Sequence, residues 1–308
     1  MTKANTPLLR AAGYQGAGIN ATVLPQFVDA CRPALGAAAC SVELDVTAAG
    51  ATAQSLFESV ADGSREVAYM ASGYLSAQVS ELGVIDLPFH VSDRARALGS
   101  LDGAAGTMIR AAVAAKSKLR VLGFWDNGFR HVSNRVRDIR GPADCSGLVC
   151  RTLDSALYRD SLAAIGFVPR TTDVKLLRQM VASGEVDAQE NPLTNTINFQ
   201  LYEHHKHVSL TGHFFGVMLL LCNAAWFDGL SKPAREAVLA AAAAATAQQR
   251  RLAAAEDQTG VATLQAKGVT VIPAAGIDLA AMRQRCAPIV ARACAALPPA
   301  LVDAYGRG

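Results

Sequence analysis

Strand patterns and helix patterns alternate along this chain, and that order limits its fold more than any other feature. A short apolar run over residues 8–14 predicts a strand, and a helix over 20–35 is interrupted or ends near Pro33. Residues 42–46 alternate apolar and polar side chains, which predicts a second strand. Helical spacing from Leu56 to Val60 and an apolar run over 66–70 complete a βαβαβ order. This order favours a mainly parallel sheet with helices on both faces.

The same alternation recurs in the second half of the chain, so the expected fold class is α/β with two lobes. A length of 308 residues exceeds one ordinary domain, and a hydrophobic content of 51% can fill two cores. We expect one lobe from 1–127 and 214–250 and another from 128–213 and 251–308, with a ligand cleft where their strands' carboxyl ends meet. The predicted elements of the second half are strands over 119–125, 148–151, 168–170 and 186–189 and helices over 154–165 and 174–183.

One predicted helix is unusually long. Ser231 is suited to cap it, Pro233 suits its first turn, and six alanines over 240–245 favour helix strongly. Only Gly260 interrupts the pattern before Gly268. A helix over about 35 residues measures about 50 Å, which exceeds the width of one lobe. We therefore expect it to run along both lobes.

Composition excludes several functional classes. A net charge of +3 with scattered arginines argues against a nucleic-acid binder, which would carry a basic stripe. The longest apolar candidate, 214–222, is far shorter than the ~20 residues of a membrane span. Residues 1–5 lack a secretory core, so the protein is cytoplasmic or its signal peptide has been removed. The seven cysteines include no Cys-x-x-Cys pair, and whether Cys31 and Cys40 form a disulfide stays open.

Three strings run from a strand or helix end into polar residues: Gly123–His131, Gly147–Arg151 and Gly184–Pro192. Their tips carry Arg130, Arg151 and Asn191. A guanidinium presents a planar fork of donors that matches a carboxylate, and an amide can both donate and accept. No nucleophile paired with a base accompanies them, so the pattern indicates binding of an acid without catalysis.

Further candidates for ligand contact lie at the ends of other predicted strands. Tyr14 and Gln15 follow the first strand, and Ser72 and Tyr74 follow the third. His213 and Phe214 lie where the chain is expected to cross between the lobes. The alternative for His213 is a core histidine satisfied by the backbone, and ordinary turn residues are the alternative for the other four.

In order and spacing, six strings resemble the solute-binding proteins of tripartite ATP-independent periplasmic (TRAP) transporters, the DctP-like family. The resemblance extends over nearly the whole chain and includes the long helix after Lys232. The strings are Ser72-Gly73-Tyr74-Leu75, Asp86-Leu87-Pro88-Phe89, Trp125-Asp126-Asn127-Gly128-Phe129-Arg130, Gly147 to Arg151, Gln189-Glu190-Asn191-Pro192 and Leu210-Thr211-Gly212-His213-Phe214.

The resemblance implies a Venus-flytrap receptor, exported to the periplasm, that closes on an organic acid and docks to membrane permease subunits. It implies no cofactor and no metal, and we expect a monomer. Arg151 occupies the place of the family's carboxylate-clamping arginine, and Arg130 that of a second cationic contact. Gln189 and Glu190 are interpreted as support for the strand end.

The expected ligand is a monocarboxylate such as a hydroxy acid, keto acid or sugar acid. Many relatives carry an aromatic residue and a Glu where this chain has Val174 and Leu176, so one wall of the site is expected to be more apolar or roomier. Two alternatives remain, which are a receptor for a dicarboxylate or an aromatic acid and a cytoplasmic or sensory ligand-binding protein of the same fold.

An enzyme or a metal protein is the rival class. His204, His205 and His207 cluster in the sequence, but spacings of one and three do not place three ligands on one helix face. We interpret them as a solvated helix end. Cys150 lies in an apolar strand pattern, which does not suit an activated nucleophile. Cys145 and Cys150 are expected to act as small core residues.

Overall fold

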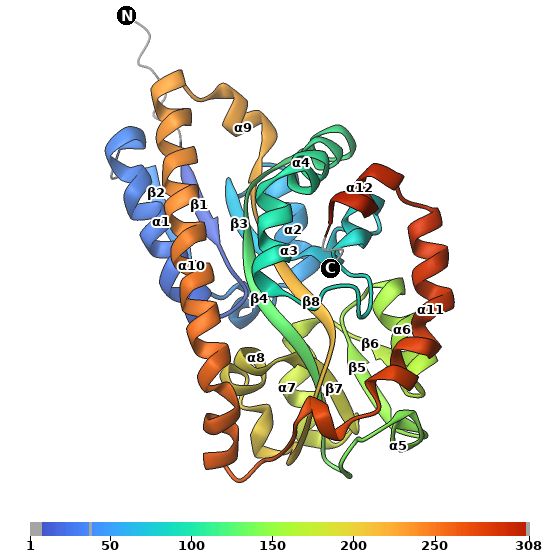
Figure 1. Ribbon diagram of the computed structural model, residues 1–308. Helices are drawn as coiled ribbons and strands as arrows, with labels where there is room; N and C mark the ends of the chain where they lie inside the picture. Colours follow the sequence, from blue (N-terminus) through green and yellow to red (C-terminus); the bar gives the residue numbers. More distant parts are fainter. Residues whose placement is uncertain (1–7, 37–38, 306–308) are drawn as a thin grey trace, which may run out of the picture. The chain divides into compact units, whose positions relative to one another are not determined.

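The structure is a computed structural model that describes residues 8–36 and 39–305 (Figure 1). The chain forms two compact units. The first comprises the described residues up to Ala71, Arg110–Trp125 and Met218–Leu252, and the second comprises Ser72–Ile109, Asp126–Val217 and the described residues from Ala253 onward. The lobe boundaries that the sequence suggests stay a prediction. Residues 1–5, which bear on export, lie outside the described residues.

Three parallel strands begin the first unit. β1 (Leu9–Ala12) pairs in parallel with β2 (Cys40–Glu43) and with β3 (Val67–Ala71). β3 pairs antiparallel with β8 (His207–Asn223), whose residues 218–222 lie opposite it. The sheet of this unit is therefore mixed, whereas the sequence favoured a mainly parallel one.

Helices cover these strands as the βαβαβ order predicts. α1 (Ile19–Leu35) packs on β1 and β2, and α2 (Ala53–Ala61) packs on β3. Thr52 caps α2, because its hydroxyl accepts from the backbone N–H of Ser55. α1 continues two residues beyond Pro33, so that proline lies in its last turn and does not cut it short.

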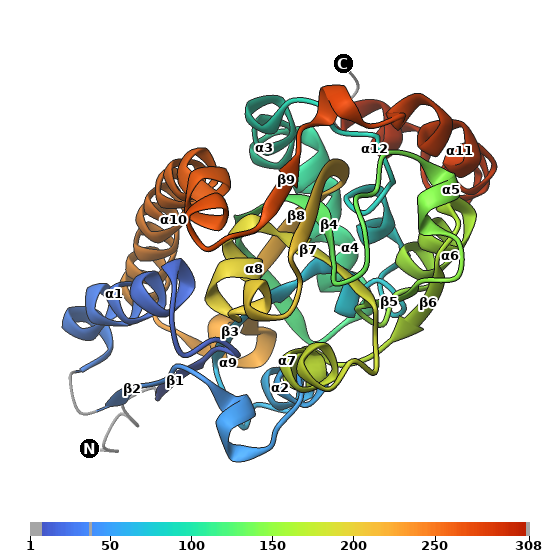
Figure 2. The same ribbon diagram turned by 90° about the horizontal axis from the view of Figure 1, so that it is seen from below.

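The second unit has its own strand order. β4 (Leu119–Asn134) pairs antiparallel with β7 (Ala188–Pro192), and β7 pairs in parallel with β5 (Val149–Thr152). β5 pairs in parallel with β6 (Val168–Thr171). Figure 2 shows β9 (Thr270–Ile272) beside β8, where the two pair in parallel.

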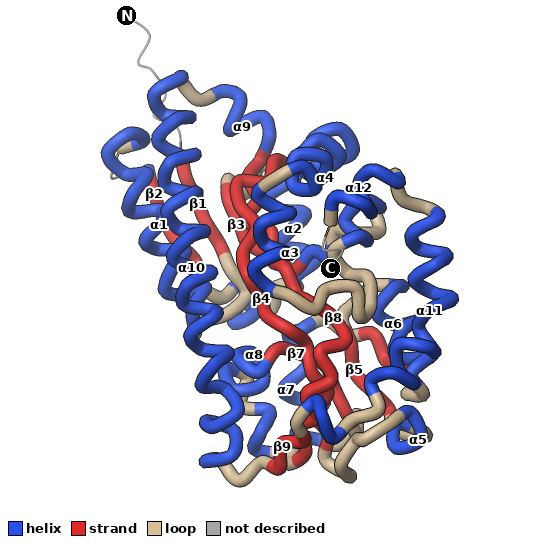
Figure 3. Tube along the Cα trace, viewed as in Figure 1, coloured by secondary structure: helices blue, strands red, loops and turns tan. Residues whose placement is uncertain are grey.

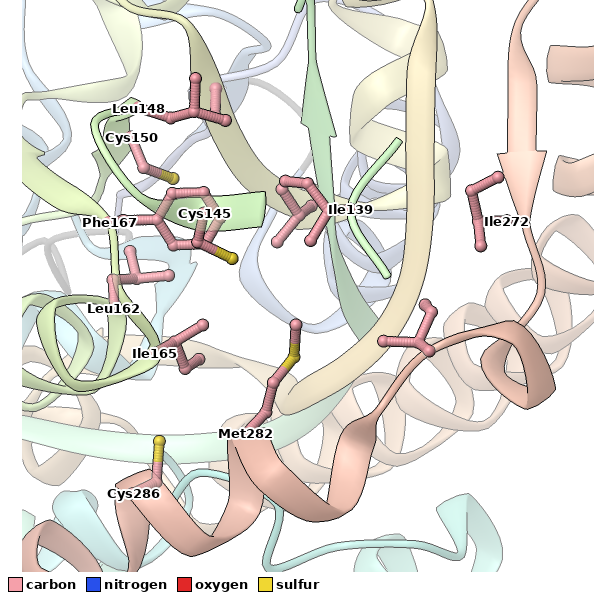
Figure 4. Close-up of a cluster of buried hydrophobic side chains, with 13 residues drawn as sticks. Ile139, Cys145, Leu148, Cys150, Leu162, Ile165, Phe167, Ile272, Met282 and Cys286 are labelled. Carbon is pink, nitrogen blue, oxygen red and sulfur yellow. The ribbon is translucent and has the colours of Figure 1, made fainter. Parts of the chain in front are cut away.

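Neighbouring residues of β5 pack into two different hydrophobic clusters. Cys150 belongs to a cluster with Leu162 and Ile165 of α6 (Ala156–Ile165), and Figure 4 shows it with the buried Cys145 and Cys286. Val149, its neighbour, packs instead against a cluster that includes residues of α7 (Val174–Ser183). Successive side chains of a strand point to opposite faces. Helices therefore cover both faces of β5, as Figure 3 shows.

The remaining elements complete the two units. The α-helices are α3 (Arg94–Asp102), α4 (Ala104–Lys116), α5 (Pro142–Cys145), α8 (Leu193–Asn198), α9 (Ala224–Gly229), α10 (Lys232–Ala266), α11 (Leu279–Ala295) and α12 (Pro299–Ala304). The 3-10 helices are η2 (Val46–Ala49), η3 (Ser72–Tyr74), η4 (Ser80–Val84), η5 (Leu201–Glu203) and η6 (Ala274–Gly276).

The long helix predicted over 232–266 is confirmed as α10, which has 35 residues. It begins in the first unit and ends in the second. Figures 1 and 2 both show its first half beside α1, where Gln249 Nε2 donates to Asn20 Oδ1 at 3.2 Å. No helix in the described part of the chain combines the length and the apolar character that a membrane crossing requires.

Three predicted strands differ most from the observed ones. The strand over 42–46 ends at Glu43, because Asp45 accepts from the Thr47 N–H and starts the 3-10 turn η2. β4 continues nine residues beyond Trp125, since its later part pairs with β7. The strand predicted over 186–189 begins at Ala188 and ends at Pro192.

All seven cysteines lie in the described part of the chain and are free thiols. Cys31 and Cys40 are both buried, and no disulfide joins them. Burial, with the nearby Cys40 thiol, raises the pKa of Cys31 to about 12. Cys145 and Cys150 are buried in the apolar cluster of the second unit, in agreement with the expectation that they are core residues.

The end of β1 depends on a close approach between Gly13 and Tyr69. A Cβ on Gly13 would lie 2.6 Å from Tyr69 Cε1. The Tyr69 ring cannot retreat, because it is fully buried between Tyr14 and Trp125, with ring centroids 5.3 and 5.4 Å away.

We therefore expect Gly13→Ala to lower the free energy of unfolding by about 1–3 kcal/mol through overpacking. Gly229→Ala is the matched control in the same unit, because a Cβ there meets no atom within 4 Å. Urea unfolding of both variants measures the difference. Equal stability of Gly13→Ala and the parent would contradict the expected clash.

Candidate functional site

Register between β4 and β7 brings Arg130 and Asn191 together. Arg130 lies opposite Pro192, and His131 lies opposite Asn191. The sequence suggested that Arg130 follows a strand and that Asn191 ends one. Both residues instead lie within paired strands, because the polar run from Asp126 to Arg130 continues β4. Backbone pairing therefore holds both side chains on a rigid support.

Arg130 forms a buried ion pair with Glu190. Its Nε contacts Glu190 Oε2, and its Nη2 donates to Glu190 Oε1 at 2.9 Å. Both side chains are almost fully buried. Thr152 Oγ1 also donates to Glu190 Oε1 at 2.7 Å. The bidentate geometry and the added donor satisfy the carboxylate, so the charges of Arg130 and Glu190 largely compensate each other.

Arg151 is also buried, with 2% of its surface exposed, but its surroundings differ. Its Nε and Nη2 donate to the backbone carbonyl of Thr172, with the Nε bond at 3.1 Å. No carboxylate of the described residues forms an ion pair with it. A guanidinium is a cation, so Arg151 is a buried positive charge without a carboxylate partner among the described residues.

Tyr74 lies beside this guanidinium. Burial raises the pKa of the Tyr74 phenol, and the charge of Arg151 partly offsets that rise. The backbone N–H of Val174, at the first turn of α7, also lies close enough to favour the phenolate. Arg151 and the first turn of α7 therefore place donors beside Tyr74, whereas the carboxylate of Asp173, which caps α7, opposes negative charge there.

Asn191 belongs to a chain of hydrogen bonds whose direction follows from Arg130. A guanidinium can only donate, so Asn191 Oδ1 accepts from Arg130 Nη2 at 3.2 Å. Asn191 Nδ2 donates to Gln189 Oε1 at 2.5 Å, and Gln189 Nε2 donates to Ser133 Oγ at 2.6 Å. The Ser133 hydroxyl and His205 Nδ1 share a further hydrogen bond at 3.0 Å. Arg130 and Gln189 thus hold the Asn191 amide in one orientation.

Ser72 and Tyr74 meet two residues that the sequence reasoning did not select. The Ser72 hydroxyl donates to Asp86 Oδ1 at 3.0 Å, and the Tyr158 hydroxyl donates to the same oxygen at 3.3 Å. Tyr74 packs against the apolar cluster that contains Tyr158 and Phe214. The rings of Tyr158 and Phe214 stack with centroids 4.0 Å apart. The sequence pointed to Asp86 only through its position as the one carboxyl in the otherwise apolar string Asp86-Leu87-Pro88-Phe89.

His213 is a buried neutral histidine. Burial, followed by the positive charge of Arg130, lowers its pKa to about 3. Its Nδ1 shares a hydrogen bond with the Thr211 hydroxyl at 2.7 Å, and its Nε2 lies 3.7 Å from Glu190 Oε2. A side chain, not the backbone, satisfies Nδ1, so the alternative of a backbone-satisfied core histidine is wrong in that detail.

Tyr14 and Gln15 belong to the first unit. Both are buried at the end of β1. The Tyr14 hydroxyl lies 3.6 Å from Met218 Sδ, and Gln15 Oε1 accepts from Asn20 Nδ2 at 3.0 Å. Their neighbours within the unit therefore hold both side chains in place. The other seven predicted contacts are the residues of the second unit described above.

The histidines at 204–207 do not form a metal site. His205 is fully buried, and burial lowers its pKa to about 3, so the interpretation of a solvated helix end is wrong for this residue. His207 begins β8, and its Nδ1 lies 2.9 Å from Asp138 Oδ1. Within the residues that the structure describes, no group of three or more His, Cys, Asp or Glu side chains could hold a metal ion.

The α/β fold brings together donor-rich polar groups in the second unit, and such groups are suited to bind an anion. The family model of the bacterial extracellular solute-binding proteins, family 7 (DctP), matches residues 39–296. The chain therefore belongs to this family of solute-binding transport proteins. This membership confirms the resemblance seen in the sequence and the expectation that the protein is not an enzyme.

Two curated relatives and one solved structure illustrate the similarity. A solute-binding protein of Verminephrobacter eiseniae is 34% identical over 245 residues, or 80% of this chain and 72% of that protein. The 2,3-diketo-L-gulonate-binding periplasmic protein YiaO of Escherichia coli is 30% identical over 220 residues, or 71% and 67%. A TRAP periplasmic solute-binding protein of Roseobacter denitrificans with bound β-D-glucuronate matches with a TM-score of 0.90 and 26% identity, covering 96% and 98%.

Proposed function

We propose that this protein is the periplasmic receptor of a TRAP transporter and captures a small monocarboxylate. It then delivers that acid to membrane permease subunits, acting as a monomer. The ligand is a hydroxy acid, a keto acid or a sugar acid. The observation that carries the proposal is the buried Arg151 guanidinium, which has no carboxylate partner among the described residues.

Arg151 is suited to be the clamp because a buried charge is costly without a partner. A ligand carboxylate would supply the missing negative charge and accept two parallel hydrogen bonds from the planar guanidinium. The Tyr74 phenol, whose raised pKa keeps it protonated, lies beside the same guanidinium, and the Val174 N–H lies beside Tyr74 as a further donor. These neighbours support a carboxylate as the group that Arg151 binds.

The charges around the second arginine favour one carboxylate over two. Glu190 already compensates Arg130 through a bidentate ion pair. His213 is neutral, because its pKa is lowered to about 3. Arg151 is then the cation of this group whose charge no described carboxylate cancels. A second carboxylate of a dicarboxylate would meet no free counter-charge here and would meet Glu190 as a like charge.

Two relatives support the acid class. YiaO is named for 2,3-diketo-L-gulonate, and the Roseobacter protein holds β-D-glucuronate. Each of these molecules combines one carboxylate with several hydroxyl or keto oxygens. Asn191, Ser72 and Tyr74 would serve such oxygens, since amides and hydroxyls both donate and accept. We therefore extend this ligand class to the present chain.

A thermal-shift screen tests the proposal with D-glucuronate, pyruvate, lactate, succinate and benzoate. We expect a monocarboxylate to raise the melting temperature most, because binding at a hundredfold excess over Kd stabilises the folded state by ~2.7 kcal/mol. D-glucose is the matched control, since it keeps the ring of glucuronate and lacks the carboxylate. Stronger stabilisation by succinate, or equal stabilisation by glucose, would contradict the proposed ligand class.

A further inference from the structure

Asp86 has no role in the proposed function, although it is hydrogen-bonded to the predicted ligand contact Ser72. Asp86 is completely buried. Its Oδ1 accepts from the hydroxyls of Ser72 and Tyr158, and its Oδ2 has no hydrogen-bond partner among the described residues. No described cationic side chain forms an ion pair with it. A buried carboxyl with two neutral donors and one bare oxygen is suited to carry a proton.

The groups around Asp86 bring the pKa of its carboxyl close to neutral pH. Burial raises its pKa to about 7, and the donors Ser72 and Tyr158 partly oppose the rise. The charged groups that face it are Arg130, which favours the carboxylate, and Glu190, which disfavours it. Tyr305 is close enough for the Asp86 charge to raise the pKa of its phenol.

Tyr158, a hydrogen-bond partner of Asp86, connects Asp86 to residues of the proposed acid site. The Tyr158 ring stacks on Phe214 at 4.0 Å, and the Arg130 guanidinium lies over the same ring at 5.5 Å from its centroid. Three residues later the chain turns sharply, with Phe89 at a φ of 56°, which is rare for a residue with a bulky side chain. That turn lets the Phe89 N–H donate to the His213 carbonyl at 2.8 Å.

We propose that Asp86 is a positioning residue of the acid site and takes up a proton when a monocarboxylate binds. The proton comes from the buffer and adds to Oδ2, the oxygen that has no donor. This inference depends on the proposed function, because the incoming anion drives the uptake. A negative charge near a buried carboxyl disfavours its ionised form, so binding shifts Asp86 towards the neutral acid.

Linkage gives the sign of the pH dependence. If binding raises the proton affinity of Asp86, protonation of Asp86 raises the affinity for the acid by the same factor. Affinity then falls as pH rises from about 6 to about 8. A rise of one unit in the pKa corresponds to a factor of about ten in affinity, and to an uptake of about half a proton near pH 7.5.

Calorimetry of D-glucuronate and pyruvate binding in buffers of different ionisation enthalpy measures the protons taken up. Both probes stay ionised between pH 6 and 8. We expect the parent to take up about 0.3–0.7 proton near pH 7.5. Asp86→Asn should take up none and bind with an affinity that no longer depends on pH in this range. Glu256→Gln is the matched control at a second carboxyl whose pKa burial raises, and it should retain the uptake.

Calorimetry on the parent protein tests the proposal even if Asp86→Asn does not fold. Binding of either probe with no proton uptake would overturn it and leave the proposed function intact. An uptake unchanged in Asp86→Asn would also overturn it. Tyr158→Phe keeps the ring and removes one donor to the carboxylate, so the pH midpoint of the affinity should move upward. If neither probe binds at all, the proposed function fails and the inference fails with it.

Discussion

Arg151→Ala is expected to weaken the binding of monocarboxylates by about two orders of magnitude or more. A carboxylate bound to the buried guanidinium loses its water shell and depends on the charge of Arg151. Removing one partner of such a pair costs about 2–5 kcal/mol, much of it because the other charge stays unpaired. Calorimetry with D-glucuronate or pyruvate measures the loss as a change in Kd.

Arg151→Lys should also bind poorly, because it keeps the charge and loses the planar fork. Arg170→Ala is the matched control. Arg170 lies opposite Arg151 in the β5–β6 register, but its side chain is exposed and pairs with Glu185. We expect this control to leave the affinity unchanged. Parent-like binding by Arg151→Lys would contradict a bidentate clamp, and a larger loss in Arg130→Ala than in Arg151→Ala would assign the clamp to Arg130.

Glu190→Gln is expected to lower the free energy of unfolding by about 3–5 kcal/mol. The substitution keeps the volume of the side chain and removes its charge. Arg130 would then lose the carboxylate of its bidentate ion pair while its side chain stays 3% exposed to solvent. Chemical unfolding followed by tryptophan fluorescence measures the change, since Trp125 is fully buried.

Asp228→Asn provides the comparison for this prediction. Asp228 pairs with Arg120 at 2.6 Å, but about half of its side chain is exposed. Surface pairs contribute about 0–1 kcal/mol, because water solvates both charges after the pair is broken. A loss in Glu190→Gln as small as that in Asp228→Asn would show that the buried pair does not stabilise the fold beyond a surface contact.

Local sequence patterns predicted the bounds of a helix correctly where residues at its own ends cap or terminate it. α7 has the predicted bounds of 174–183, because Asp173 caps its first turn and Gly184 ends it in the left-handed conformation. α10 likewise matches the predicted 232–266. In both helices the hydrogen bonds are internal to the segment, so neighbouring residues determine where the helix starts and ends.

Strands were less predictable, because their hydrogen bonds go to distant segments. Asp126, Asn127 and Gly128 have the composition of a loop, yet they lie within β4. The pairing of 130–134 with 188–192 extends that strand, and it also moves Arg130 from an expected loop to a strand interior. The sequence of either segment alone does not predict the register in which the two strands pair.

The sequence by itself determined the α/β class, the family, the long helix and the residue types suited to bind an acid. Tertiary structure alone decided which arginine has a partner. Glu190 compensates Arg130, whereas Arg151 meets the Thr172 carbonyl and the Tyr74 phenol and pairs with no described carboxylate. The burial of Asp86 without an ion-pair partner among the described residues was equally invisible in the sequence. The physical reason is that charge compensation depends on distance and solvent exposure, and strand register and helix packing set both of these.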